Sequence, residues 1–221
     1  MRFDAPERLY FCFDYISHNA YLAWHSLEPL LREHGLTLEP VPVLFAAMLS
    51  HYKQVGPAEL PAKSRWMLWN VLRKAHHMGV PIAAPHSHPF NPLLPLRLSC
   101  AVEGAARVQL VDRLFRATWA ESRAVSDPVT MQALLAETGD EALFAQAQAE
   151  PVKQRLRQYT DAALAAGAFG VPTMLVRGEL FWGYDDLAHL KLFLEGRDPL
   201  PADRSGYADW FKVQPSAERA R

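Results

Sequence analysis

The first apolar strand of the chain runs into the sequence FDYIS at Phe13–Ser17, and a later stretch, GVPT at Gly170–Thr173, runs into another apolar strand. Ser17 is predicted to stand where a strand ends and a helix begins, where its oxygen can cap the helix. The Val171–Pro172 bond is predicted to be cis, because a backbone that faces a ligand at this turn requires that form and cis bonds are confined mainly to such proline sites. In that form the N–H and C=O of Val171 turn away from their own sheet and can pair with a peptide-like ligand.

Around the first stretch, the hydrophobic pattern predicts a β–α–β unit. Leu9–Tyr15 is a dense apolar run of strand length, and the helix that follows has one apolar face and ends near Gly35. Leu36–Phe45 alternates enough to be a second strand. Pro40 and Pro42 predict that this strand is either an edge strand or an interrupted one, since proline cannot donate to a neighbouring strand.

The middle of the chain, from about Pro61 to Gly167, shows helical periods between breaks marked by proline and glycine, and no convincing strand. One predicted helix has four apolar residues on a single face: Trp66, Trp69, Leu72 and Ala75. The tryptophans of the chain are expected in the core or at interfaces.

Strand signals return after these helices. Thr173–Val176 and Leu180–Trp182 flank a short turn and form a predicted hairpin. Asp185–Asp186 is expected to cap a last helix that ends before Gly196.

The order of elements, βαβ, helices and then ββα, is the thioredoxin topology. We therefore expect an α/β, thioredoxin-like fold interrupted by an all-helical insertion. The thioredoxin-like domain is placed at residues 7–58 plus 168–213, and the helical insertion domain at 59–167.

Composition narrows the possible functions. Lys+Arg number 23 and Asp+Glu 24, a net charge of 23 − 24 = −1, and no long run of one sign suggests nucleic-acid or membrane binding. The charged start Met1–Arg8 and the lack of a long apolar stretch predict a soluble, cytoplasmic protein. Cys12 and Cys100 are expected to be buried free thiols in preference to a disulfide, and no Cys-x-x-Cys motif supports dithiol redox chemistry.

Histidines raise the question of a metal site. His76 and His77 fall on a predicted helix, and His86 and His88 on the proline-rich loop 85–92, but no carboxylate or cysteine completes a set at ligand spacing. We expect no metal. His88 is instead expected to line a substrate cleft.

Two motifs in this chain resemble those of the 2-hydroxychromene-2-carboxylate isomerases and kappa-class glutathione transferases, relatives of the DsbA oxidoreductases. The family opening DFxSPYxYLA stands here as DYISHNAYLA at Asp14–Ala23. The closing pattern GxFGVPT, followed by FxGxDR, stands as Gly167–Thr173 and Phe181–Asp186. The resemblance runs from about residue 9 to residue 196.

The resemblance implies a glutathione site. Ser17 corresponds to the catalytic serine, whose hydroxyl would hydrogen-bond the glutathione sulfur; taken alone, the residue reads as a helix cap. Val171, before Pro172, would pair with the cysteinyl unit, and Asp185 with the Tyr184 backbone would hold the amino end. The implied glutathione-binding residues are Ser17, Gln54, Lys63, Val171, Pro172, Tyr184 and Asp185.

The chain departs from the family pattern at three positions. His18 and Asn19 replace a Pro-Tyr pair beside the sulfur, and Asp186 replaces an arginine. His18 is predicted to be catalytic, either protonated beside a thiolate or neutral and passing a proton, so that activity would change near pH 6.5. A solvated loop residue is the alternative. Asn19, His88 and Trp182 are expected to contact the substrate.

The function that the resemblance implies is a glutathione-dependent cis-trans or ring-opening isomerase acting on an aromatic-degradation intermediate. A homodimer is implied as well. Lys53, Lys63 and Arg65 are the candidates for binding a substrate carboxylate. Two alternatives stay open: a kappa-like glutathione transferase or peroxidase, and a non-catalytic thioredoxin-fold binding module.

Overall fold

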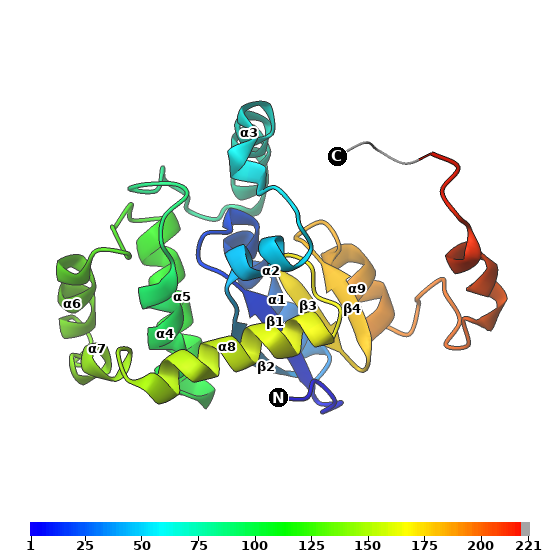
Figure 1. The fold of residues 1–221 in the computed structure, drawn as a ribbon. Coiled ribbons are helices and arrows are strands. Elements are labelled where there is room, and N and C mark those ends of the chain that lie inside the picture. The colour runs from blue at the N-terminus through cyan, green and yellow to red at the C-terminus, as the bar shows by residue number, and fades with distance from the viewer. Residues whose placement is uncertain (218–221) are drawn as a thin grey trace.

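The computed structural model describes residues 1–217, and within them the strands form a four-stranded sheet (Figure 1). The strands are β1 (Arg8–Phe13), β2 (Thr37–Pro42), β3 (Thr173–Val176) and β4 (Glu179–Trp182), in the order β2-β1-β3-β4. β1 pairs parallel with β2 and antiparallel with β3, which pairs antiparallel with β4. The predicted thioredoxin-like order of elements is therefore confirmed.

β1 is buried on both faces, because its side chains alternate between two clusters. The odd-numbered residues of Leu9–Phe13 pack in the larger core with α1 (His18–Glu33). Tyr10 and Cys12 pack in a smaller core that includes a residue of α8 (Glu150–Ala165). The unbroken apolar run in the sequence is what a strand covered on both sides requires.

β2 is the edge strand that Pro40 and Pro42 predict. The predicted extension of this strand to Phe45 is wrong, because α2 (Phe45–His51) begins there. The reason is a tertiary contact: the buried carboxylate of Asp14 accepts a hydrogen bond from the Phe45 N–H at 3.0 Å. That bond satisfies one of the free amides at the start of the helix.

The predicted helical middle is confirmed, since the described chain between α2 and β3 contains helices and no strand. The helices are η1 (Pro57–Glu59), α3 (Pro61–Met78), α4 (Leu93–Ala101), α5 (Gly104–Trp119), α6 (Pro128–Ala136), α7 (Ala142–Gln146) and α8. α8 packs against β2 and α2, so it also covers one face of the sheet. The limits 59–167 for a separate helical domain stay a prediction.

The chain after the hairpin continues into α9 (Leu187–Leu194) and the 3-10 helix η2 (Ser205–Lys212). Asp186 is the N-cap residue of α9, but the predicted capping bond is absent. Its carboxylate instead accepts from the Trp182 N–H at 2.9 Å and lies 2.7 Å from His189 Nδ1. Asp186 therefore ties the end of β4 to α9.

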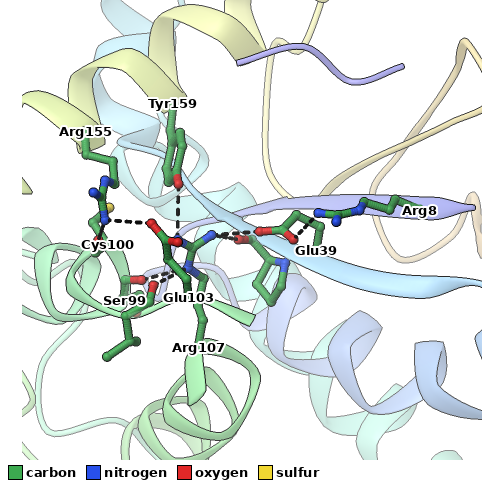
Figure 2. Close-up of polar contacts among 10 residues, drawn as sticks. Arg8, Glu39, Ser99, Cys100, Glu103, Arg107, Arg155 and Tyr159 are labelled. Atoms are coloured by element: carbon green, nitrogen blue, oxygen red, sulfur yellow. Dashed lines mark hydrogen bonds and ion pairs between the residues drawn. The ribbon is translucent and has the colours of Figure 1, made fainter. Parts of the chain in front are cut away.

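The helical segment is joined to the sheet through the buried Arg107 of α5, shown in Figure 2. Arg107 Nε donates to the carbonyl oxygens of Ser99 and Val102 at 3.0 and 2.8 Å. Nη1 lies 2.8 Å from the Glu39 carboxylate of β2, and Nη2 donates to the Tyr159 hydroxyl of α8 at 3.1 Å. A buried guanidinium needs such acceptors, so these contacts favour one placement of α4, α5 and α8 on β2.

The predicted apolar face of α3 is only partly buried. Ala75 is buried, but Trp66, Trp69 and Leu72 are 60%, 55% and 36% exposed, and α3 stands away from the rest of the molecule (Figure 1). Trp24 and Trp119 lie in the core, as expected. The buried residues of α3 are Val71 and Ala75, so the predicted face is wrong except at Ala75. Periodicity alone did not reveal which side of the helix is covered.

Cys12 and Cys100 are free and buried, as predicted. Burial raises the pKa of each thiol to about 12, so neither is a thiolate at neutral pH. Among the described residues, no helix is long and apolar enough to cross a bilayer.

Candidate active site

The candidate site is centred on Ser17, the N-cap residue of α1. Ser17 Oγ accepts a hydrogen bond from the Ala20 N–H at 3.1 Å and donates a long one to the Val171 carbonyl at 3.4 Å. The first amides of a helix have no partner within it, and together with the helix dipole they favour a negative charge. Ser17 therefore caps the helix and faces the main chain of Val171 at the same time.

The turn at Val171–Pro172 lies opposite Ser17. The Val171–Pro172 bond is cis, as predicted. Pro172 O accepts from the Gly183 N–H at 2.8 Å, and Thr173 Oγ1 donates to Gly170 O at 2.7 Å. Within residues 1–217, the Val171 N–H donates to no acceptor. The turn thus offers a free N–H and a weakly bonded C=O, the pair that an extended peptide uses.

A buried carboxylate, which sequence reasoning missed, supports the turn before Ser17. The two oxygens of Asp14 accept from the N–H groups of Ile16 and Phe45 at 3.1 and 3.0 Å, and its carbonyl accepts from the Ser17 N–H at 3.1 Å. Burial raises the pKa of Asp14 to about 7, although the two accepted bonds oppose the change. The available signal was an acidic residue directly after a buried strand.

His18 is the first residue of α1 and is only 8% exposed. Burial, together with the smaller effects of the nearby His88 and Lys74, lowers the pKa of its imidazole to about 4. The ring is therefore neutral at neutral pH. The alternative of a solvated loop residue is wrong, because His18 is buried in the first turn of α1. A change of activity near pH 6.5 stays a prediction.

The buried His18 should make stability depend on pH. Between pH 6.5 and 4 the unfolded chain binds a proton at this residue and the folded protein does not, so its contribution is complete above pH 6.5 and is lost as the pH falls toward 4. We expect wild type to lose about 3 kcal/mol relative to His18→Asn over this range. Urea unfolding of both proteins at several pH values measures the difference.

Two features make this comparison clean. The raised pKa of Asp14 makes a contribution of opposite sign to stability over the same pH range. Because Asp14 is present in both proteins, this contribution cancels in their difference. His77→Asn, which removes an exposed histidine of α3, should follow wild type. If the free energies of unfolding of wild type and His18→Asn changed equally with pH, the pKa of His18 would not be lowered in the folded protein.

His88 and Trp119 line the space beside His18. His88 Nε2 lies 3.0 Å from Ile16 O, and Trp119 Nε1 donates to Tyr15 O at 2.9 Å. The Trp119 ring centroid is 5.7 Å from that of each imidazole. The structure thus brings His88 next to the predicted site. Trp119, the last residue of α5, was not among the predicted site residues, and its sequence position carries no signal of this contact.

Two buried polar atoms at the start of α1 have no hydrogen-bond partner among the described residues: His18 Nδ1 and Asn19 Oδ1. Leaving such groups unpaired costs about 1–3 kcal/mol each. Their position, directly after Ser17, fits a bound molecule with polar groups.

Sequence reasoning also missed Lys74 of α3. Its Nζ lies 2.8 and 2.9 Å from the two carboxylate oxygens of Asp185, and 4.8 Å from the ring centroid of Tyr184. Asp185, predicted to hold an amino group, is therefore already paired with a cation of the protein. The available signal was position, because Lys74 follows the buried Val71 by three residues and so shares its helix face.

The remaining predicted residues lie at the periphery. The half-exposed ring of Trp182 lies 5.0 Å from that of Phe169. Gln54 and Lys63 are exposed, and their side chains make no hydrogen bond or ion pair within the described part of the chain. Neither is brought against Ser17 by a contact of its own, and their roles stay predictions.

Residues 8–195 match the family model of the DSBA-like thioredoxin domain. The chain belongs to this family. It is also 30% identical, over 188 residues, to the 2-hydroxychromene-2-carboxylate isomerase of Pseudomonas putida, with 82% of this chain and 91% of the relative covered. This degree of similarity places it with the 2-hydroxychromene-2-carboxylate isomerases.

Two further relatives agree with this membership. Glutathione s-transferase kappa 2 of Caenorhabditis elegans is 28% identical over 181 residues, which cover 74% of this chain and 78% of the relative. A solved structure of a 2-hydroxychromene-2-carboxylate isomerase superposes with a TM-score of 0.79 at 25% identity, covering 86% of this chain and 95% of that chain. The resemblance inferred from the two motifs is confirmed, and the relatives are enzymes by name.

Proposed function

We propose that this chain is an isomerase of the 2-hydroxychromene-2-carboxylate isomerase type that uses glutathione as its cofactor and acts on a small aromatic-degradation intermediate. The observation that carries the proposal is the Ser17 hydroxyl at the N-terminus of α1, facing the Val171 main chain across the turn at Pro172. A thiol placed there lies beside a hydrogen-bond donor and a helix N-terminus, and both lower its pKa.

The site fits glutathione on structural grounds. The free N–H of Val171 suits the main chain of the cysteinyl unit, and the unpartnered atoms of His18 and Asn19 suit polar groups beside it. Further residues would hold the two ends of the tripeptide: Gln54, Lys63, Tyr184 and Asp185. Asn19, His88 and Trp182 are proposed to contact the substrate.

Bound glutathione would supply a nucleophilic sulfur that adds to a conjugated carbon of the substrate and leaves again after bond rotation. Ser17 would hydrogen-bond this sulfur while it is anionic. His18 is neutral at pH 7, so its imidazole can take up or give back a proton during addition and elimination. Asp14 would hold the turn that presents Ser17.

The kappa-class relative favours one second candidate, a transferase or peroxidase in which glutathione leaves bonded to the product or oxidised. The same site would serve it, because both reactions need an activated glutathione sulfur. A non-catalytic binding module remains the third possibility, with Ser17 acting only as a cap.

The test is an assay of glutathione binding and consumption. Millimolar glutathione bound with micromolar affinity should raise the free energy of unfolding by about 4 kcal/mol. For the proposed isomerase, a catalytic amount of glutathione supports many turnovers on the ring-opened substrate and is recovered unchanged. Stoichiometric consumption would favour the transferase, and the absence of binding would favour the binding module.

We also propose a cytoplasmic homodimer with no role in nucleic-acid binding. The exposed Trp66 and Trp69 of α3 support an interface there. The variant Trp66→Gln/Trp69→Gln should sediment as a monomer at concentrations where wild type is a dimer. Trp210→Gln removes a still more exposed tryptophan on η2 and should remain dimeric. A dimeric double variant, or a monomeric wild type, would contradict the proposal.

A further inference from the structure

We propose that Lys74 and Asp185 together bind the zwitterionic α-amino-acid end of glutathione, with Lys74 taking the carboxylate and Asp185 the ammonium. This inference rests on the proposed function and assigns a new specificity-determining residue, Lys74, to the same site. Four observations carry it: the geometry of the ion pair, its unequal exposure, its position beside Ser17 and its charge pattern.

The ion pair is well formed. Lys74 Nζ lies within 2.9 Å of both carboxylate oxygens of Asp185. An ammonium carries three N–H donors and a carboxylate has about four acceptor positions, so the pair leaves donor and acceptor capacity on both sides. The other contact of Nζ within the described chain is the ring of Tyr184. Each partner can therefore accept a further ligand group without giving up the other.

The two partners differ in exposure. The Lys74 side chain is 14% exposed, because its stem is covered at the buried face of α3, whereas the Asp185 side chain is 82% exposed. The lysine is thus a fixed cation, and the carboxylate is presented to solvent. This difference in exposure favours ligand binding, because the buried aliphatic stem of Lys74 limits the motion of Nζ and so lowers the entropy lost when a ligand binds.

The pair lies on two segments that border the predicted site: α3, which contacts α1, and the chain that follows Gly183. The charge of Lys74 acts on His18, the residue after Ser17, and helps to lower its pKa. On the other side, Asp185 follows Gly183, whose N–H bonds to Pro172 in the cis turn. A peptide whose middle pairs with Val171 therefore has the ion pair within the same site.

The charge pattern selects a zwitterion. A ligand end with both an ammonium and a carboxylate places each opposite its complement, so the charges alternate in sign. An end with only the ammonium is repelled by Lys74, and an end with only a carboxylate is repelled by Asp185. The carboxylate of Asp186 contacts Trp182 and His189. In the described chain, the cation that pairs with Asp185 is Lys74.

The experiment compares glutathione with γ-aminobutyryl-cysteinylglycine, the same peptide without the α-carboxylate, by calorimetry. Wild type should bind glutathione about 10-fold more tightly, the value expected for one charge-assisted contact. Lys74→Met keeps the aliphatic stem and should bind the two peptides with nearly equal affinity. Arg73→Met, which removes the neighbouring exposed cation of α3, should keep the wild-type ratio.

The outcomes separate this inference from the proposed function. If wild type binds glutathione but the ratio is near one, or if Lys74→Met keeps the wild-type ratio, the assignment of Lys74 is overturned and the isomerase proposal stands. If wild type binds neither peptide, both fail. Lys74→Gln, which also keeps an aliphatic stem, gives the same test if Lys74→Met does not fold.

Discussion

Ser17→Ala is expected to lower kcat/KM by at least about 100-fold, the usual effect of removing one donor that stabilises a developing anion. Its cost in stability should be only about 1 kcal/mol, because the variant loses one capping hydrogen bond, from the Ala20 N–H. The loss of rate would come from the missing hydrogen bond between Ser17 Oγ and the glutathione sulfur. The loss of stability would come from the missing bond between the same oxygen and the Ala20 N–H. Turnover and urea unfolding of the purified variant measure them separately.

Asp127→Ala is the matched control. Asp127 caps α6 by accepting from the Thr130 N–H at 2.8 Å, so its loss should cost about as much stability as the loss of the Ser17 cap. It lies at a different helix and should leave turnover unchanged. If Ser17→Ala retained full glutathione-dependent activity, as Asp127→Ala should, Ser17 would be a cap and nothing more.

Arg107→Met is expected to lower the free energy of unfolding by about 3–5 kcal/mol, as the loss of one partner from a buried ion pair does. The variant leaves the buried Ser99 and Val102 carbonyls without their donor and separates β2 from α5 at Glu39 (Figure 2). Because methionine fills part of the space of the arginine side chain, the decrease in the free energy of unfolding measures mainly the lost polar contacts. Urea or guanidinium unfolding provides the measurement.

Arg113→Met is the comparison. Arg113 also bonds to carboxylates, those of Glu121 and Glu137, but its side chain is partly exposed. Exposed ion pairs contribute about 1 kcal/mol or less, so this variant should remain close to wild type. Equal losses for the two variants would mean that the Arg107 cluster does not hold the helices to the sheet.

The parts of the fold that follow from local sequence were predicted well. The first strand, which ends at Phe13 and not at the predicted Tyr15, the capping Ser17 and the cis turn at Pro172 each depend on a few adjacent residues. The helical middle follows from periodicity over long windows. In contrast, the start of α2 at Phe45 depends on a carboxylate 31 residues earlier, which no local pattern reveals.

The candidate site divides in the same way. The two motifs identify the serine and the valine that face each other. Lys74 reaches Asp185 across 111 residues of sequence, and Trp119 reaches Tyr15 across 104, so their roles appear only once the chain is folded. The pKa of His18 could not be predicted either, because it is set by burial, and the position of a histidine in a motif says little about its solvent exposure.

The central claim is that glutathione binds with its sulfur at Ser17, and a crystal structure of the complex tests it most directly. We expect the glutathione sulfur within hydrogen-bonding distance of Ser17 Oγ, with the cysteinyl main chain paired to the N–H and C=O of Val171. A structure from crystals saturated with glutathione that shows the sulfur elsewhere, or the Val171 N–H without a ligand partner, would contradict it.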